Sequence, residues 1–541
     1  MPDTAGTGAL SAADVIATTL YRAGVRHAFG IPGGEVLTLV DALERAGIRF
    51  RLAKHENAAG FMAEGTWHAT GAPAVLVATV GPGVANAFNV VANAEQDRVP
   101  LIVLSGMVDP AEALSYTHQV FDHGAVFQRV CKASIQVPEG AADLAIAKAL
   151  RIAMSPRKGP VHLDLPIAVA ASTHAAPRPI PFEPAAPSGP GGEFLKAARI
   201  FETAERPVIL AGLDLLEEPD GPTALRVFAE ENRVPVLTTY KAKGVIPEDH
   251  PLSLGGHGLS PKSDALVLPI LAEADCVIAA GYDPIEMRAG WRAPWDPAKC
   301  LEFGHAENRH DMHHAAHASV CSVSEALATL MAVSPPRDRW PEDALAEARG
   351  RIEAAFAPGT QWGPDVAMAE LLAALPEDAV TTADSGAHRI LLSQQFYARR
   401  PRTLLHSSGL CTMGCALPLG IGHKIAAPDR PVVTFQGDAG LEMVLGELAT
   451  LRDSGLNVVV VVICDRSLAL IELKQRRMGL QSAGVDFGGT AFAEVARAMG
   501  GLGLRVDGPG QAGQALAEAL AADRFALIEV HVPRRSYDGL F

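Results

Sequence analysis

Short apolar segments alternate with amphipathic segments along the whole chain, and this alternation limits the possible folds more than any other feature. Strands are predicted at 27–30, 51–53, 74–79, 101–105, 208–211, 236–239, 276–280, 432–436, 458–464 and 526–530. A helix is predicted over 11–24, where Ser11 can cap the first turn and Val15, Ile16, Leu20 and Tyr21 share one face. A second helix is predicted over 34–44. Strands that alternate with helices favour parallel sheets with helices on both faces, so we predict an α/β fold.

Two proline-marked stretches divide the chain into three blocks. Residues 175–192 are rich in Pro and Gly, and residues 334–340 form a shorter break. Such composition is typical of extended connectors. A chain of 541 residues is too long for one core, and at about 150 residues per domain it favours three domains. We predict domains at residues 1–175, 193–333 and 341–541.

Charge and cysteine content exclude several classes of protein. The formal net charge of −15 argues against a nucleic-acid partner and against an anionic membrane surface. The seven cysteines are scattered and include no CxxC pair, which indicates reduced thiols of a cytoplasmic protein. The N-terminus lacks a basic segment followed by an apolar one, and the longest apolar run, 458–464, is too short to span a bilayer.

Two aspartates follow neighbouring predicted strands in the last block. Asp438 lies in the sequence QGDAG, which follows the strand 432–436 and precedes a helix predicted over 441–453. Small residues there let backbone N–H groups approach a phosphate. Asp465 follows the strand 458–464, and the separation of 27 residues (438 to 465) fits a strand–helix–strand unit. Mg²⁺ prefers one or two carboxylates together with phosphate oxygens, so this edge of the sheet is a candidate magnesium site.

The two motifs resemble the metal motif of the thiamine diphosphate enzymes of the acetolactate synthase and 2-oxo acid decarboxylase family. In that family GDG is followed after about 27 residues by Asn or Asp, and a main-chain carbonyl two residues later completes the protein ligands. The resemblance implies that Asp438, Asp465 and the Ser467 carbonyl bind Mg²⁺. The residues implied to contact the cofactor here are Gly437, Asp438, Ala439, Gly440, Asp465, Ser467, Leu468, Ala469 and Leu470. Ala439 replaces the second Gly, and Asp465 replaces the commoner Asn, as in catabolic, FAD-free acetolactate synthases.

The first block carries a candidate activating carboxylate. The segment 54–65 (KHENAAGFMAEG) resembles the family's HExxAxxxAxGYA stretch, whose Glu hydrogen-bonds the aminopyrimidine ring of the cofactor. The resemblance gives that role to Glu56, and the chemistry needs a carboxyl group whose pKa rises on burial. Alternatively, Glu56 simply favours a helix N-terminus. The segment 79–86 (TVGPGVAN) resembles the family's TSGPGxxN turn, so Gly81 and Pro82 are further cofactor-binding candidates.

Further resemblances complete the candidate site. The run 408–414 (SGLCTMG) resembles GLGTMG, which implies that Met413 wedges between the two rings of the cofactor and that the Cys411 carbonyl accepts its exocyclic amine. Standing alone, a Met such as Met413 is more often a plain core residue. A loop with Gly386, Ala387 and His388 resembles a diphosphate-contacting loop. Gln119 lies where acetolactate synthases have a Phe-Gln pair near the reacting carbon, and His118 replaces the Phe.

Other positions bear on the substrate and on FAD. Lys474 lies where biosynthetic acetolactate synthases carry a Trp, and we hypothesise that it pairs with a substrate carboxylate; a solvated surface Lys is the alternative. The stretch 281–286 resembles the FAD-independent members, which argues against FAD. The roles of Arg288 and the tail 534–541 stay open. A metal site is disfavoured at His305, His310, His313, His314 and His317, because their spacing fits no familiar ligand set.

The resemblance implies a thiamine diphosphate- and Mg²⁺-dependent enzyme. We predict that it decarboxylates a 2-oxo acid, with pyruvate as the first guess, and ligates the retained fragment to a carbonyl acceptor. The alternatives are a non-ligating 2-oxo acid decarboxylase and a C–C lyase acting on an acyl-CoA or sulfonated substrate. A nicotinamide dehydrogenase is disfavoured because no GxGxxG opens a helix. The family pairs its two cofactor-binding domains across a subunit interface, so a homodimer or homotetramer with interfacial active sites is implied.

Overall fold

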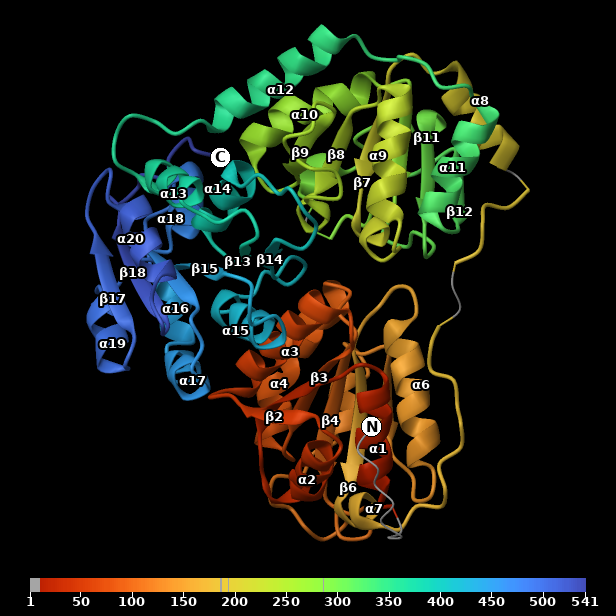
Figure 1. Cartoon of the computed structure of the whole chain (residues 1–541), viewed down its shortest axis with the longest axis vertical. Coiled ribbons are helices and arrows are strands. Elements are labelled where there is room, and N and C mark those ends of the chain that lie inside the picture. Colours follow the sequence, from red (N-terminus) through yellow and green to blue (C-terminus); the bar gives the residue numbers. More distant parts are fainter. Residues whose placement is uncertain (1–9, 185–186, 193, 286) are drawn as a thin grey trace. The chain divides into compact units, whose positions relative to one another are not determined.

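The computed structural model describes residues 10–184, 187–192, 194–285 and 287–541. Residue 193, where the middle domain was predicted to begin, and Glu286 lie outside the described residues. The chain forms two compact units, of which the first comprises residues 1–185, 409–429 and 444–456 and the second comprises the rest. Together they contain three sheets of six parallel strands, so the predicted α/β fold is confirmed (Figure 1). No helix among the described residues is both long and apolar enough to cross a membrane.

The first unit is built around a sheet with the order β2-β1-β3-β4-β6-β5. Its strands are β1 (His27–Ile31), β2 (Arg49–Leu52), β3 (Ala74–Ala78), β4 (Leu101–Met107), β5 (Ala133–Gln136) and β6 (Val161–Pro166). Its helices are α1 (Ala12–Arg22), α2 (Leu37–Arg45), α3 (Glu56–Thr70), α4 (Pro82–Gln96), α5 (His123–Phe127), α6 (Ala142–Met154), α7 (Ile167–Ala171), α15 (Ala416–Ala426) and α17 (Glu447–Ser454). A 3₁₀ turn, Gly34–Val36, replaces the first turn of the helix predicted from residue 34.

Helix α1 confirms the predicted cap and corrects the predicted face. Ser11 accepts a hydrogen bond from the Asp14 N–H in a capping box, as serine at this position favours. Ile16 and Leu20 are buried in a core that includes Val75 and Val77 of β3. The assignment of Tyr21 to the same face was wrong, because the residue is 38% exposed and its ring lies beneath the Arg26 guanidinium.

Helices α3 and α15 pack against each other through glycines. A Cβ atom on Gly422 would lie 1.8 Å from the Met62 carbonyl oxygen, and one on Gly65 would lie 2.3 Å from the Leu419 carbonyl oxygen. Only glycine permits backbones to approach this closely. This packing fixes α3, the helix that begins at Glu56.

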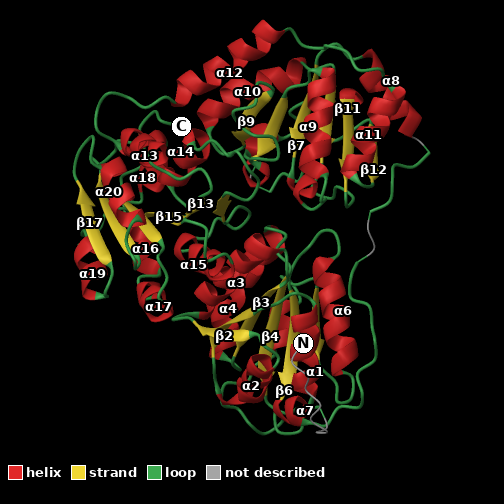
Figure 2. Ribbon diagram, viewed as in Figure 1, coloured by secondary structure: helices red, strands yellow, loops and turns green. Residues whose placement is uncertain are grey.

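The second unit holds the middle sheet, with the order β12-β11-β10-β7-β8-β9. Its strands are β7 (Pro207–Ala211), β8 (Val236–Thr239), β9 (Ser253–His257), β10 (Cys276–Ala280), β11 (Cys300–Gly304) and β12 (His317–Val320). Helices α8 (Phe194–Thr203), α9 (Gly221–Asn232), α10 (Pro261–Glu273) and α11 (Val323–Val333) flank these strands in Figure 2. Ile209 and Ile278 face one core, and their neighbours Val208 and Val277 face another, so both faces of the sheet are buried.

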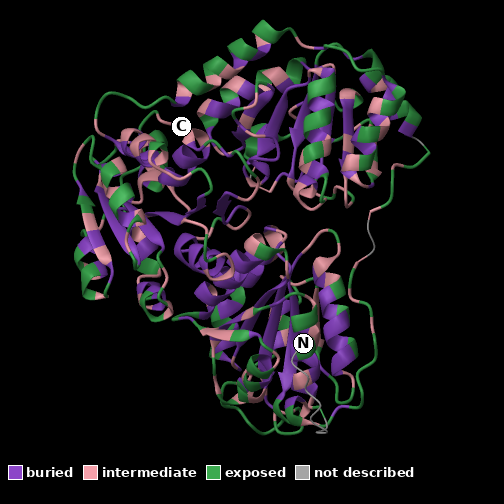
Figure 3. Ribbon diagram, viewed as in Figure 1, coloured by how far each residue is buried: buried purple, intermediate pink, exposed green. Residues whose placement is uncertain are grey.

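The second unit also holds the last sheet, with the order β14-β13-β15-β16-β18-β17. Its strands are β13 (Val380–Ala383), β14 (Leu404–His406), β15 (Val432–Gly437), β16 (Val459–Cys464), β17 (Leu502–Val506) and β18 (Ala526–His531). Its helices are α13 (Pro364–Ala373), α14 (Ala387–Gln395), α16 (Asp438–Met443), α18 (Ala469–Arg477), α19 (Phe492–Ala498) and α20 (Ala512–Leu520). The central strands β15 and β16 are buried at every position except Gly437, the last residue of β15; Figure 3 colours the chain by burial.

Two sequence-based boundaries differ from the structure. The single helix predicted over 441–453 is two helices, since α16 begins at Asp438 and α17 begins only at Glu447. Helix α12 (Glu342–Phe356), placed by sequence in the last block, packs through Ala348 and Ile352 on the core of the middle sheet. The boundaries 1–175, 193–333 and 341–541 remain predictions.

Candidate functional site

The second unit places two carboxylates at the carboxyl ends of paired parallel strands. Asp438 follows β15 and Asp465 follows β16, and these strands pair with Gly437 opposite Ile463. Asp438 accepts hydrogen bonds from the Arg466 N–H (2.7 Å) and the Ala439 N–H (2.9 Å). Both aspartates are buried. The strand register therefore brings together the two residues that the sequence separates by 27 positions.

Electrostatics at this pair favour a bound cation. Burial and the charge of Asp438 raise the pKa of Asp465 to about 7. Burial also raises the pKa of Asp438, although two backbone N–H groups oppose the shift. The Oδ2 atom of Asp465 is buried without a hydrogen-bond partner. A buried carboxylate oxygen without a partner costs free energy that a divalent cation repays, so the pair fits Mg²⁺.

The other predicted diphosphate contacts lie beside this pair. Ser467 donates to Asp486 at 3.2 Å, and the Leu468 N–H donates to the Val485 carbonyl at 2.8 Å. These bonds hold the turn in which Ser467 precedes Leu468, Ala469 and Leu470, the last two in α18. The candidates Ala439 and Gly440 lie within α16.

The His388 ring lies beside Gly437, the residue before Asp438. A Cβ atom on Gly437 would lie 3.4 Å from the His388 ring, and one on Gly386 would lie 2.7 Å from it. Gly386, with φ of 155°, precedes Ala387 at the start of α14. Burial lowers the pKa of His388 to about 3, so its imidazole is neutral, and its buried Nε2 atom has no partner.

The first unit places Glu56 at the N-terminus of α3. The side chain is buried, and its Oε2 atom accepts a hydrogen bond from the Asn86 amide at 3.0 Å. The N-cap is His55, whose Nδ1 accepts from the Asn57 N–H. Gly83 lies beside Glu56, since a Cβ atom there would be 3.4 Å from Oε1. The structure therefore joins the predicted activating carboxylate to the predicted GPG turn.

The GPG turn also contacts the loop that carries Gln119. Gly81 has φ of 67°, and a Cβ atom there would lie 2.5 Å from the Gln119 carbonyl oxygen. Pro82 then starts α4. Gln119 has φ of 62°, which a non-glycine residue rarely adopts, and both Gln119 and His118 are exposed.

The segment with Cys411 and Met413 is attached to α4. The Gly409 N–H donates to Asp97 at 2.7 Å, and Thr412 donates to Asn89 at 3.1 Å. Cys411 is exposed with φ of 52°, and Met413 is partly exposed, so Met413 is not a core residue of this unit. The first unit thus contains Glu56, Gly81, Pro82, His118, Gln119, Cys411 and Met413, and the second contains the aspartates, Ser467 and His388.

Several contacts were not anticipated from the sequence. Asn86 was given no role of its own from the sequence, yet its side-chain amide bonds Glu56. Arg535 of the tail and Arg476 of α18 both hydrogen-bond the buried Glu472 of α18. Tyr537 and Phe541 of the tail are buried in the core of the last sheet, so the tail is fixed to that core. Charge pairing between a tail and a helix carries no local sequence signal.

Lys474 and the histidine-rich stretch 305–317 are the remaining candidates. Lys474 is exposed on α18. No cluster of three or more His, Cys, Asp or Glu side chains suited to a metal occurs in the described part of the chain, which includes the five histidines between 305 and 317.

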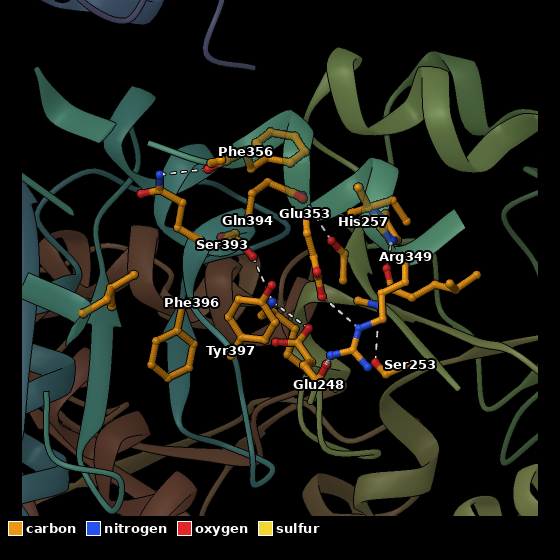
Figure 4. Close-up of a pocket in the computed structure, with 18 of the residues that line it drawn as sticks. Glu248, Ser253, His257, Arg349, Glu353, Phe356, Ser393, Gln394, Phe396 and Tyr397 are labelled. Carbon is orange, nitrogen blue, oxygen red and sulfur yellow. Dashed lines mark hydrogen bonds and ion pairs between the residues drawn. The ribbon is translucent and has the colours of Figure 1, made fainter. Parts of the chain in front are cut away.

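A separate cavity of about 290 Å³ lies in the second unit, lined by β9, α12 and the end of α14 (Figure 4). Beside it Lys243 and Glu248 form a buried ion pair of 2.7 Å. Lys243 also donates to the Ser393 carbonyl (2.9 Å), and Glu248 accepts from the Ala398 N–H (2.7 Å). These contacts connect the middle sheet to the last one. None of the predicted site residues lines this cavity.

Comparison with known proteins agrees with the geometry. Residues 10–126, 195–331 and 384–530 match the N-terminal, central and C-terminal domains of the thiamine pyrophosphate enzymes. The chain is 29% identical to an acetolactate synthase of Bacillus subtilis, over 96% of this chain and 93% of that protein. It is 32% identical to the large subunit of acetolactate synthase isozyme 1 of Escherichia coli, over 86% and 83%. It is also 32% identical to a probable 2-ketoarginine decarboxylase of Pseudomonas aeruginosa, over 91% and 88%.

The three domains match in order, and the relatives resemble this protein over most of the chain. Together these matches define the class of protein. The chain belongs to the thiamine pyrophosphate enzymes, as an acetolactate synthase-like member of the carboligase and decarboxylase type.

Proposed function

We propose that the protein uses thiamine diphosphate and Mg²⁺ to decarboxylate a 2-oxo acid, pyruvate being the first candidate, and to ligate the retained fragment to a carbonyl acceptor. The observation that carries the proposal is the buried Asp438–Asp465 pair with its unpartnered oxygen, at the strand ends where ligands of parallel sheets bind. The names of two relatives, both acetolactate synthases, support the ligation step.

In this proposal Asp438, Asp465 and the Ser467 carbonyl hold Mg²⁺, and His388 and residues 437–440 and 468–470 face the diphosphate. When bound, thiamine diphosphate supplies a carbon nucleophile and an electron sink for the loss of carbon dioxide. Glu56 exchanges a proton with the pyrimidine, and the Asn86 amide holds the carboxyl group in place. Gln119 and His118 face the substrate from the exposed loop over Gly81.

The first experiment is to incubate the protein with pyruvate, thiamine diphosphate and Mg²⁺ and to follow the products by proton NMR. We expect acetolactate. Acetaldehyde as the sole product would replace the ligase proposal with a simple decarboxylase. The Pseudomonas relative carries the name of a decarboxylase, which is why this alternative is included. If cofactor binds and pyruvate is not consumed, a panel of longer 2-oxo acids, a sulfonated aldehyde and acyl-CoA substrates identifies the donor. Release of no product from any of these would refute the proposal.

The metal site is tested by two substitutions at one position. Asp465→Asn keeps a side-chain oxygen that binds Mg²⁺, so we expect thiamine diphosphate affinity within about tenfold of the wild type, which corresponds to about 1.4 kcal/mol. Asp465→Leu removes that oxygen, so we expect Mg²⁺-dependent binding to fall below detection by isothermal titration calorimetry. Equal affinities for both variants would show that Asp465 does not bind the metal.

Lys474 is proposed to pair with a substrate carboxylate. Its ammonium is exposed, and no ion pair involves it among the described residues, so it is available to an anion. We expect Lys474→Met to lower kcat/KM for an anionic acceptor by about 10-fold and to leave a neutral acceptor unchanged. Equal loss with both acceptors would identify Lys474 as a surface residue without a role in recognition.

We further propose a homodimer or homotetramer in the cytoplasm, without FAD. Against FAD stands the resemblance of residues 281–286 to FAD-independent enzymes. Absorbance of the purified protein near 450 nm tests for flavin, and light scattering gives the oligomeric state. The residue ranges 1–175, 193–333 and 341–541 remain our proposed domain boundaries.

A further inference from the structure

A buried polar network lies behind the GPG turn and uses no residue assigned above except Gly81. The Gly81 N–H donates to His123 Nε2 at 3.3 Å, and His123 Nδ1 lies 3.0 Å from Asp164 Oδ1. Ser105 Oγ lies 2.7 Å from the same Asp164 oxygen and 2.6 Å from His162 Nε2. Ser134 Oγ lies 2.7 Å from His162 Nδ1. Apart from Ser134, these side chains are buried.

The directions of these hydrogen bonds follow from one another. Because the Gly81 N–H is a donor, His123 Nε2 must be the acceptor, so the proton of the neutral ring is on Nδ1 and points to Asp164. Ser105 donates to Asp164, accepts from His162 Nε2–H, and leaves His162 Nδ1 to accept from Ser134. Burial lowers the pKa of His162 to about 4, in agreement with a neutral ring. Every donor then has an acceptor, and the chain of hydrogen bonds ends on the Asp164 carboxyl group, an arrangement that is rigid when fully satisfied.

The object held by this network is the Gly81 turn. On its other side the turn touches the Gln119 backbone, since a Cβ atom on Gly81 would lie 2.5 Å from the Gln119 carbonyl oxygen. The ring of Phe121, two residues along the loop, packs edge-on against His123 at 4.8 Å. His123 therefore contacts both the turn and the loop that carries Gln119.

We propose that His123, oriented by Asp164, is a positioning residue for the reaction: it fixes the Gly81 turn and thereby the Gln119 loop that faces the substrate. The inference rests on the proposed function for the role of Gln119, but the contacts that carry it are independent of any substrate. It assigns a catalytic consequence to a buried histidine that is not among the candidate site residues. Displacement of a site group by about 1 Å costs up to about 100-fold in rate, so a loosened turn has a measurable effect.

Three variants of the full-length protein test the proposal. His123→Phe keeps an aromatic ring but can neither accept from Gly81 nor donate to Asp164. His123→Gln keeps one acceptor and one donor. Ser134→Ala is the matched control, because it removes the hydrogen bond at the far end of the network and leaves the Gly81 contact intact. Hydrogen–deuterium exchange of peptides covering residues 79–83 and 116–122 reports the turn and the loop without any substrate, and steady-state kinetics on the 2-oxo acid turned over by the wild type give kcat and KM.

We expect His123→Phe to speed exchange in both peptides and to lower kcat by about 10- to 100-fold with a smaller change in KM. We expect His123→Gln to restore kcat to within about threefold of the wild type, and Ser134→Ala to match the wild type in both measurements. Unchanged exchange in His123→Phe overturns the proposal, whether or not the enzyme turns over a 2-oxo acid. Faster exchange with unchanged kcat also overturns it, because His123 would then be structural only. If the wild type turns over no substrate, the proposed function fails separately while the exchange data still decide whether His123 holds the turn.

Discussion

The buried ion pair beside the cavity of Figure 4 allows a stability prediction with an internal control. Lys243 and Glu248 each expose only 4% of their side chains. Glu248→Gln would leave the Lys243 ammonium buried without its counter-charge. Breaking a buried pair in this way costs about 3–5 kcal/mol. At about 2–4 °C per kcal/mol for a domain of this size, we expect Tm to fall by about 6–20 °C.

The next residue provides the matched control. Asp249 pairs with Arg399 at 2.9 Å, but both side chains are about half exposed, 50% and 51%. An exposed pair contributes about 0–1 kcal/mol, so Asp249→Asn should lower Tm by at most about 4 °C. Glu248 and Asp249 are neighbours, and each also bonds the segment near residue 398, Glu248 through the Ala398 N–H and Asp249 through the Arg399 side chain, so the two substitutions differ mainly in burial.

Differential scanning calorimetry of the wild type and the two variants measures the effect. The double substitution Lys243→Met with Glu248→Leu removes both charges, and we expect it to recover most of the loss, because apolar replacement of a buried pair is often neutral or stabilising by about 1–4 kcal/mol. If Glu248→Gln and Asp249→Asn lower Tm equally, within about 2 °C, the burial argument is wrong.

Two further predictions concern stability. Gly422→Ala would place a Cβ atom 1.8 Å from the Met62 carbonyl oxygen, so it should destabilise the protein by at least about 1–3 kcal/mol. Gly350→Ala on α12 meets nothing within 4 Å and should stabilise the protein by about 0.5–1 kcal/mol. Urea unfolding midpoints compare the two variants, and equal effects would refute the close approach of the two helices. Burial works to raise the pKa of Glu218, but hydrogen bonds from His305 and neighbouring groups outweigh it and lower the pKa to about 2 from an ordinary 4.5. Because the folded-state pKa is depressed, the stabilisation is present above about pH 4.5 and is lost as the pH falls toward 2. Glu218→Gln should therefore lower Tm at pH 7, and its Tm should approach that of the wild type near pH 2. A difference in Tm that does not change with pH would contradict this.

The sequence predicted best what depends on local apolar patterning. The strands 236–239 and 276–280 match β8 and β10 at both ends, and both strands are buried at every position. Contacts between distant residues were not predictable in this way. Glu447 starts α17 and accepts a hydrogen bond from the Lys54 N–H, 393 residues earlier, and no pattern within 441–453 announces the helix break before it.

In the candidate site, too, local spacing was predictable from the sequence, whereas contacts between distant residues were not. The spacing of Asp438 and Asp465 predicted neighbouring strand ends, since strand–helix–strand geometry fixes that distance. The bond from Asn86 to Glu56 and the role of His123 depend on how α4 and β6 pack, and sequence gives only weak hints of them. An alternation of His162 and Asp164 within an apolar strand was one such hint, because buried polar residues in a strand need partners.

The first and last sheets explain why the candidate residues are so scattered in sequence. Counted within each sheet, both have the strand order 2-1-3-4-6-5, whereas the middle sheet has the order 3-2-1-4-5-6. In the first sheet Glu56 follows strand 2, Gly81 follows strand 3 and Gln119 follows strand 4. In the last sheet, strands 1, 2, 3 and 4 are followed by His388, Met413, Asp438 and Asp465.

In chain order, each of these candidates thus follows one of the first four strands of one of two sheets with the same topology. Parallel sheets bind ligands at that edge because loop lengths there are free to vary while the strands beneath stay fixed. The middle sheet shares the α/β class but not this order, and it contributes none of the candidates. The shared order therefore gives the two proposed roles equivalent places in two separate sheets: Glu56, the proposed proton-exchanging carboxylate, follows strand 2 of the first sheet, and Asp438 and Asp465, the proposed metal-binding pair, follow strands 3 and 4 of the last sheet.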